Sequence, residues 1–183
     1  MINLGFGSLR PDSYSPSIYN INYYKLSENG IRYALFDVDC TIVPFDTIEV
    51  DNDLSVLFRY IKILGISSAL FSSNFDSKVK PIAASLGVNY ACLRLKPFSS
   101  FSDVRELFGP KCNPENTVYI GDSFFFDMMQ AYNLQVYKIL VDMIRDNRCL
   151  KLYVNDVLQM IMSNTVVSPD FKFKRYYKGF LER

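Results

Sequence analysis

Two aspartates that directly follow an apolar run are the residues of this sequence best suited to chemistry. Residues 31–36 are apolar apart from Arg32, and Asp37, Asp39 and Thr41 come next. In an extended chain, residues i and i+2 project to the same side, so the two carboxylates are expected to converge where a strand ends. Carboxylates that close repel each other unless a proton or a metal ion lies between them. The pattern predicts a metal-binding pair that could also be catalytic, and the alternative is a loop with two solvated aspartates.

Further polar side chains occur at the ends of three later apolar runs. They are Ser72 after residues 66–71, Lys96 after residues 88–93, and Asp122 and Asp127 after residues 117–120. Ligand sites of α/β proteins lie at the carboxyl ends of parallel strands, so these groups are expected along one edge of a sheet. Several carboxylates with a hydroxyl and an ammonium donor suit a hard cation such as Mg²⁺ and a phosphate. Alone, a lysine is most often a solvated surface group and a serine a turn or helix cap. Together they predict phosphoryl transfer, in which positioning and charge neutralisation supply most of the catalysis.

The elements that must position these residues alternate along the chain. Strands are predicted over residues 31–36, 66–71, 88–93, 117–120 and 135–141, and helices over 54–64, 76–86, 101–108 and 125–133. This alternation is typical of an α/β fold with helical layers around a parallel sheet. A short helix is expected within residues 17–29, and residues 1–16 are expected to be irregular because they are rich in glycine, serine and proline. Pro81 interrupts the pattern of 76–86, so that helix should be kinked or start later.

The composition is that of a globular protein. The 183 residues are 49% hydrophobic and 21% charged, so we expect one domain over residues 1–183. The formal net charge of +1 creates no long-range field, and no nucleic-acid partner is expected. The sequence contains neither a secretory signal pattern nor an apolar run of membrane-spanning length. The four cysteines form no C-x-x-C pair, which argues against a zinc site and fits a reducing compartment. A cytoplasmic location, with at most peripheral membrane contact, is therefore expected.

The sequence contains no histidine. This excludes imidazole general-base chemistry and Ser-His or Cys-His triads. Carboxylates, lysine, serine, threonine or a metal ion must carry any catalysis.

The motifs resemble those of the haloacid dehalogenase-like (HAD) hydrolases. Residues 37–42 look like the first motif, D-x-D-x-T followed by an apolar residue, Ser72 and Lys96 match the second and third, and residues 121–127 match the fourth, G-D-x-x-x-x-D. The resemblance covers about residues 31–141 and implies a three-layer Rossmann-like fold with a mostly parallel central sheet. More narrowly, residues 43–46, 72–74, 86–88 and 96–97 resemble the YqeG-like HAD phosphatases, which are related to phosphatidylglycerophosphate phosphatases. Cys40 and Ser73 depart from that pattern, since the subfamily usually has asparagine at both positions.

The resemblance implies a role for each motif residue. Asp37 would be the nucleophile that forms an aspartyl-phosphate, and Asp39 would be the acid and base that serves the leaving alcohol and the water. The implied Mg²⁺ site is formed by Asp37, the backbone carbonyl of Asp39, Asp122 and Asp127. The transferring phosphoryl group would be bound by Ser72, Ser73, Asn74 and Lys96.

Access to the site is expected to be open. Residues 46–54 and 74–96 are too short to hold an inserted cap domain, which favours a bulky or membrane-presented substrate. The resemblance also implies that an oligomer is possible, because a capless site in this superfamily is often completed by a neighbouring subunit.

The C-terminal part, residues 143–183, is expected to be a helical and basic-aromatic extension. Residues 143–168 contain an amphipathic helical pattern. Residues 170–183 carry five cations against two acids, a local net charge of +3, interleaved with aromatic residues. This segment could lie on an anionic membrane surface, or it could pack on the domain with its cations solvated.

Three functions remain open from the sequence. The first is a Mg²⁺-dependent phosphomonoesterase acting on phosphatidylglycerophosphate. The second is a phosphatase for a protein, a nucleic-acid end or a sugar phosphate. The third is a HAD domain that serves as a non-catalytic scaffold.

Overall fold

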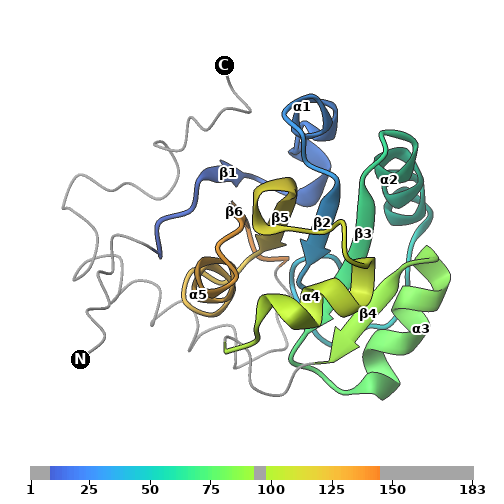
Figure 1. Ribbon diagram of the computed structural model, residues 1–183. Coiled ribbons are helices and arrows are strands. Elements are labelled where there is room, and N and C mark those ends of the chain that lie inside the picture. Colours follow the sequence, from blue (N-terminus) through green and yellow to red (C-terminus); the bar gives the residue numbers. More distant parts are fainter. Residues whose placement is uncertain (1–8, 93–97, 145–183) are drawn as a thin grey trace.

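The computed structural model describes residues 9–92 and 98–144 and shows a parallel sheet covered by helices on both faces (Figure 1). The strands are β1 (Ser13–Ser15), β2 (Tyr33–Phe36), β3 (Ser67–Ser72), β4 (Asn89–Cys92), β5 (Thr117–Gly121) and β6 (Tyr137–Val141). The α-helices are α1 (Tyr23–Glu28), α2 (Asn52–Ile63), α3 (Asp76–Leu86), α4 (Phe101–Phe108) and α5 (Phe126–Asn133), and η2 (Ile18–Asn20) and η3 (Pro114–Asn116) are short 3₁₀ helices. The predicted α/β class with a parallel central sheet is confirmed.

The two faces of the sheet bury two separate apolar clusters. The larger cluster joins Phe36 of β2 and Leu70 of β3 to residues of α1, α2 and α3. The second joins Leu35 and Phe71 to residues of α4 and α5 on the opposite face. Adjacent strand residues face opposite sides of a sheet, so each central strand is apolar on both faces. The result is a three-layer Rossmann-like arrangement.

The order of the strands places a topological switch at the centre of the sheet. The order is β1-β6-β5-β2-β3-β4, and every pairing is parallel. From β2 the chain builds β3 and β4 on one side, and then crosses to build β5 and β6 on the other. Ligands of open α/β sheets bind at the carboxyl ends of the strands beside such a point. The ends of β2 and β5 are therefore the expected place for a site.

The irregular lead-in predicted for residues 1–16 is wrong for Ser13–Ser15, which form the edge strand β1 beside β6. The strand is too short to show a periodic pattern, and side-chain hydrogen bonds help to hold it. Ser13 Oγ lies 2.9 Å from the hydroxyl of Tyr137, and the Lys138 amide donates to Asp12 Oδ2 at 2.8 Å. Polar contacts of this kind leave no hydrophobic signal in a sequence.

Other boundaries follow local backbone chemistry. The short helix expected within residues 17–29 is α1, and the 3₁₀ helix η2 precedes it, separated from it by Ile21 and Asn22. Helix α3 runs over Asp76–Leu86 with Pro81 inside it, so the later start that the proline suggested is wrong.

The described residues contain no cap domain: only a loop separates β2 from α2, and only α3 lies between β3 and β4. No described helix has both the length and the apolar character needed to cross a bilayer. The predictions for residues 145–183, which include the C-terminal part of the amphipathic helix and the basic-aromatic segment, lie outside the described residues.

Candidate active site

The first motif forms a tight loop at the end of β2. The Asp37 amide donates to the carbonyl of Ile120 at 2.9 Å, which fixes the aspartate beside β5. The chain then turns back, because the Ile42 amide donates to Val38 O at 3.1 Å and the Cys40 amide to Val43 O at 2.8 Å. Cys40 adopts a left-handed backbone conformation with φ of 65°. The turn brings Thr41 back beside Asp37.

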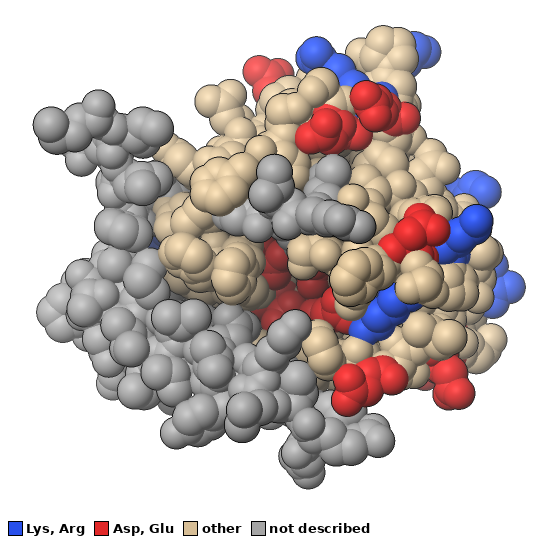
Figure 2. All heavy atoms as spheres, turned by 90° about the horizontal axis from the view of Figure 1, so that it is seen from below, with Lys and Arg blue, Asp and Glu red and all other residues tan. Residues whose placement is uncertain are grey.

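Three buried carboxylates meet at the carboxyl edge of the sheet. Asp37 follows β2, Asp122 follows β5 and Asp127 lies in the first turn of α5; each is at most 8% exposed. Each contributes a carboxylate oxygen, and these oxygens all lie within 4.8 Å of one another. Figure 2 views the molecule from this side and shows acidic side chains inside a hollow of the surface. The prediction that these strand ends gather acidic groups is confirmed for these three aspartates.

Neighbouring donors hold the three carboxylates in place. Thr41 Oγ1 donates to Asp122 Oδ1 at 2.7 Å and lies 3.4 Å from Asp37 Oδ2, so it links two of the aspartates. Asp127 accepts from the Ser123 amide at 2.8 Å and from the hydroxyl of Tyr119 at 3.3 Å. Hydrogen bonds of this kind orient metal-ligating carboxylates.

Gly121 makes room for this arrangement. A Cβ atom at this position would lie 2.4 Å from Cγ and 2.6 Å from Cβ of Asp127. The absence of a side chain at Gly121 therefore leaves space for the side chain of Asp127.

The donor set fits a divalent cation. Three carboxylates this close repel one another strongly when buried, and a cation between them removes that repulsion. The side-chain donors are oxygens, which suit hard divalent ions and not the sulfur- and imidazole-binding metals. The cluster of Asp37, Asp122 and Asp127 therefore forms a divalent-metal site.

The carboxylate of Asp39 is not a member of this cluster. Its Oδ2 accepts a hydrogen bond from Asn74 Nδ2 at 2.9 Å, and its Oδ1 is paired with the ammonium of Lys78. The expected convergence of Asp37 and Asp39 assumed an extended chain, but β2 ends at Phe36 and the backbone turns after Val38. The resemblance implied that the backbone carbonyl of Asp39 is the metal ligand, and this role stays a prediction.

The end of β3 supplies the predicted second motif. Ser72 is buried, and its Oγ accepts from the amide of Asn74 at 3.1 Å. Ser73 is exposed, and Asn74 is half-buried with its amide on Asp39. The register pairs Phe36 with both Leu70 and Ile120, so the ends of β2, β3 and β5 lie side by side. Lys96 lies outside the described residues.

Lys78 was not among the residues predicted for the site. It lies in the first turns of α3, and a helix cation is ordinarily a solvated group. One signal was present in the sequence. Lys78 precedes the buried Ile82 by four residues, so both lie on the same side of the helix.

No protein-family profile matches the chain, but individual proteins are similar to it. It is 27% identical over 131 residues to the probable phosphatase YqeG of Bacillus subtilis strain 168, covering 72% of this chain and 76% of YqeG. Among solved structures, a hypothetical protein from Xanthomonas campestris has 15% sequence identity and a TM-score of 0.50, over 76% of this chain and 79% of that one.

A further structure is the cobalt-bound form of the deoxy-D-mannose-octulosonate 8-phosphate phosphatase YrbI from Haemophilus influenzae. It has 17% identity and a TM-score of 0.49, over 65% of this chain and 81% of that one.

The sequence similarity to YqeG and the geometry of the motifs lead to the same family. The aligned stretch of 131 residues covers most of the chain, and the first, second and fourth motifs stand at adjacent strand ends around one carboxylate cluster. The order of these motifs along the chain is the one that the resemblance implied, and they meet at one edge of the parallel sheet, as the sequence predicted. The chain is a HAD-like phosphatase related to YqeG.

Proposed function

We propose that the protein is a Mg²⁺-dependent phosphomonoester hydrolase that works through an aspartyl-phosphate on Asp37. The observation that carries this proposal is the position of Asp37, which is buried to 8% exposure within the carboxylate cluster at the switch point of the sheet. A nucleophilic carboxylate needs a fixed orientation and nearby charge compensation, and this position supplies the orientation.

The proposed reaction has two steps. In the first, a carboxylate oxygen of Asp37 attacks phosphorus, the bond to the ester oxygen breaks, and Asp39 gives a proton to the leaving alcohol. In the second, Asp39 accepts a proton from a water molecule that attacks phosphorus. The acyl-phosphate bond then breaks, which releases inorganic phosphate and restores Asp37.

The remaining residues hold the reacting groups. Mg²⁺, held by Asp37, the carbonyl of Asp39, Asp122 and Asp127, supplies positive charge that offsets the charge of the transferring phosphoryl group. Ser72 donates a hydrogen bond to a phosphoryl oxygen, with Ser73, Asn74 and Lys96 as the other proposed contacts.

For the substrate, we propose a bulky phosphomonoester presented at a membrane, with phosphatidylglycerophosphate as the first candidate. Two observations support this. No cap domain is present among the described residues, and three exposed phenylalanines adjoin segments that carry the motifs. These are Phe75 after Asn74, Phe98 before α4 and Phe126 before Asp127, which are 69%, 76% and 44% exposed. Aromatic side chains that are exposed and adjacent in sequence to the motifs could contact the apolar part of such a substrate.

Phosphate release tests the activity. Wild-type protein should hydrolyse p-nitrophenyl phosphate only with Mg²⁺, and Asp37→Asn should lower kcat by at least about 10³-fold because no nucleophile remains. Asp53→Asn, an exposed aspartate at the start of α2, is the matched control and should keep full activity. A wild-type protein that binds Mg²⁺ but is inert towards several phosphomonoesters would instead be a scaffold.

A competition between substrates tests the proposed class. Phosphatidylglycerophosphate in anionic vesicles should be hydrolysed with a higher kcat/KM than glycerol phosphates, sugar phosphates or a phosphopeptide. Preference for a soluble ester would refute the lipid substrate and leave the phosphatase activity intact.

Vesicle sedimentation tests the proposed peripheral contact through residues 170–183. The full chain should sediment with phosphatidylglycerol vesicles, and deletion of this segment should reduce the bound fraction. Equal sedimentation of both proteins would remove the segment from the proposal.

A further inference from the structure

We propose that Lys78 is a positioning residue that holds Asp39 ready for proton exchange with the leaving alcohol. The inference rests on the proposed function, because it assumes that Asp39 is the acid and base of the reaction. It assigns a role to a lysine that none of the four motifs contains.

Lys78 ties three segments together at the site. Its ammonium donates to Asp39 Oδ1 in the first motif and to the carbonyl oxygen of Phe45 in the loop that follows. The same ammonium lies 5.1 Å from the centroid of the Phe45 ring, within the range of a cation–π contact. Lys78 itself belongs to α3, so it links this helix to both parts of the loop after β2.

The carboxylate of Asp39 is fixed at both oxygens. Lys78 bonds Oδ1, and Asn74 donates to Oδ2 at 2.9 Å. With two donors on opposite oxygens, the carboxylate cannot rotate about its terminal bond without breaking a hydrogen bond. Charge-assisted hydrogen bonds are the stronger kind, so Lys78 is the main constraint.

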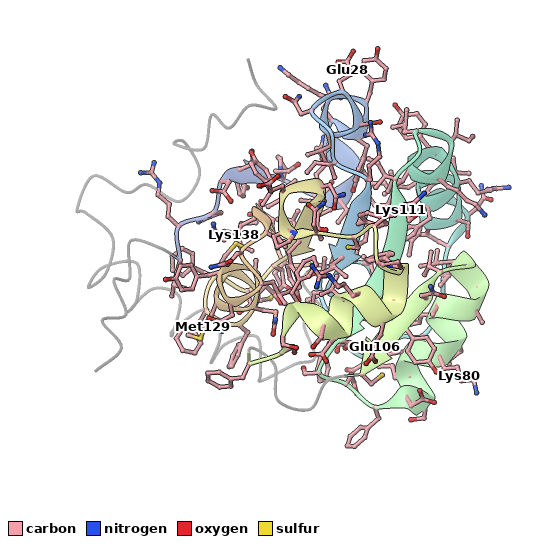
Figure 3. All side chains as sticks on the ribbon, in the orientation of Figure 1. Glu28, Lys80, Glu106, Lys111, Met129 and Lys138 are labelled. Carbon is pink, nitrogen blue, oxygen red and sulfur yellow. The ribbon has the colours of Figure 1, made fainter. Side chains whose placement is uncertain are left out.

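The surroundings of the ion pair also indicate more than a surface contact. The side chains of Lys78 and Asp39 are 15% and 18% exposed. A lysine loses hydration and rotamer freedom when it is held in this way. An ion pair on the exposed surface contributes too little free energy to offset that loss. Lys80 on the same helix shows the alternative, because its side chain points away from the protein (Figure 3).

A positioning role has a consequence that a structural role lacks. Protonation of the leaving oxygen matters for an alkyl ester, whose alkoxide is a poor leaving group. It matters little for p-nitrophenyl phosphate, whose phenolate leaves without a proton. Loss of Lys78 should therefore slow the first step mainly for alkyl esters, since general acid catalysis contributes about 10²–10⁴-fold to such steps.

The experiment compares kcat/KM, which reports the first irreversible step, for an alkyl phosphate and p-nitrophenyl phosphate in the full-length protein. Lys78→Met should lower kcat/KM for the alkyl ester by about 100-fold and for the nitrophenyl ester by less than about fivefold. Lys78→Arg should recover part of the loss, because a guanidinium also pairs with a carboxylate. Lys80→Met, the matched control, should leave both values unchanged. Thermal melting checks that each variant is folded, and Lys78→Gln replaces Lys78→Met if the latter does not fold.

Inhibition by orthovanadate, a phosphoryl mimic, separates this role from direct contact with the phosphate. Its inhibition constant should be unchanged in Lys78→Met. Equal losses on both esters, no loss on either, or a large rise in the vanadate constant would each overturn the positioning role while the enzyme remains a phosphatase. A wild-type protein that hydrolyses no phosphomonoester would refute the proposed function, and the role of Lys78 would fall with it.

Discussion

Replacement of Gly121 by alanine should damage the metal site without removing any ligand. The added Cβ would lie 2.4 Å from Cγ, 2.5 Å from Oδ2 and 2.6 Å from Cβ of Asp127. Carbon atoms in contact are ordinarily separated by about 3.5–4.0 Å, so Asp127 must retreat by about 1 Å. Rotation of the carboxylate cannot relieve a contact that includes its own Cβ. The start of α5 must therefore move, although the Asp127 amide is bonded to Ser123 O at 3.0 Å.

The size of the effect follows from these contacts. Overpacking of a buried site costs about 1–3 kcal/mol in the free energy of unfolding. Displacement of a ligating carboxylate should weaken divalent-metal binding by about 10–100-fold, as disturbance of the groups that orient ligands does. Titration calorimetry with Mn²⁺ measures the affinity, and thermal melting with and without the metal measures the stability.

Gly87→Ala is the matched control for this experiment. Gly87 caps α3 with φ of 65°, and no atom would lie within 4 Å of an added Cβ. Alanine there should cost about 1 kcal/mol from the left-handed backbone alone and leave metal affinity unchanged. The reasoning is refuted if Gly121→Ala binds Mn²⁺ with wild-type affinity, or if Gly87→Ala loses affinity to the same extent.

Three further predictions follow from single contacts. Thr41→Val removes the hydroxyl that donates to Asp122 at 2.7 Å and should lower kcat/KM by about tenfold. Thr41→Ser keeps a hydroxyl and should keep the wild-type kcat/KM. An equal loss in both variants would contradict a hydrogen-bonding role. Gln135 is exposed and follows α5 with φ of 58°. Gln135→Gly should therefore raise the free energy of unfolding, measured by urea denaturation, by about 0.5–1 kcal/mol, and a lower free energy of unfolding in the variant would contradict this. Burial raises the pKa of Tyr23 well above its ordinary value of 10.0, and its hydroxyl donates to Ile18 O at 2.9 Å. A pKa that is higher in the folded than in the unfolded protein contributes stability that is fully present below the unfolded pKa. The free energy of unfolding should therefore fall as the pH rises above about 10, and it should fall less steeply in Tyr23→Phe. Identical slopes of free energy against pH in the two proteins would refute the assignment.

Much of the fold was predictable because the central strands are buried on both faces. The runs that end at Phe36, Phe71 and Ile120 are apolar and short, and glycines or polar residues follow them. Parallel pairing of such runs brings their ends together, which is why the meeting of Asp37 with Asp122 and Asp127 could be predicted.

What the sequence did not reveal depends on single hydrogen bonds and on backbone turns. Strand β1 pairs through its backbone and through Ser13, and neither leaves an apolar pattern. Gln135 starts the predicted last strand in the sequence pattern, but its left-handed conformation closes α5, and β6 begins at Tyr137. The contacts of Lys78 could be predicted only by knowing that the loop at Phe45 folds back over α3, which no local pattern specifies.

The position of Asp39 depends on the left-handed turn at Cys40. A residue other than glycine at φ of 65° is strained, and asparagine, usual at this position in the YqeG-like family, tolerates that conformation better than cysteine does. Strain of this kind persists where the surrounding structure requires it, often at functional sites. Here the turn sends Thr41 back to the metal-site carboxylates, while Asp39 is paired with Lys78 and Asn74. An aspartate committed to the metal cluster could not also exchange a proton with an alcohol. The turn after Val38 thus separates the carboxylate of Asp39 from the metal cluster and leaves it for the acid and base role proposed above, whereas an extended strand would have placed both carboxylates together.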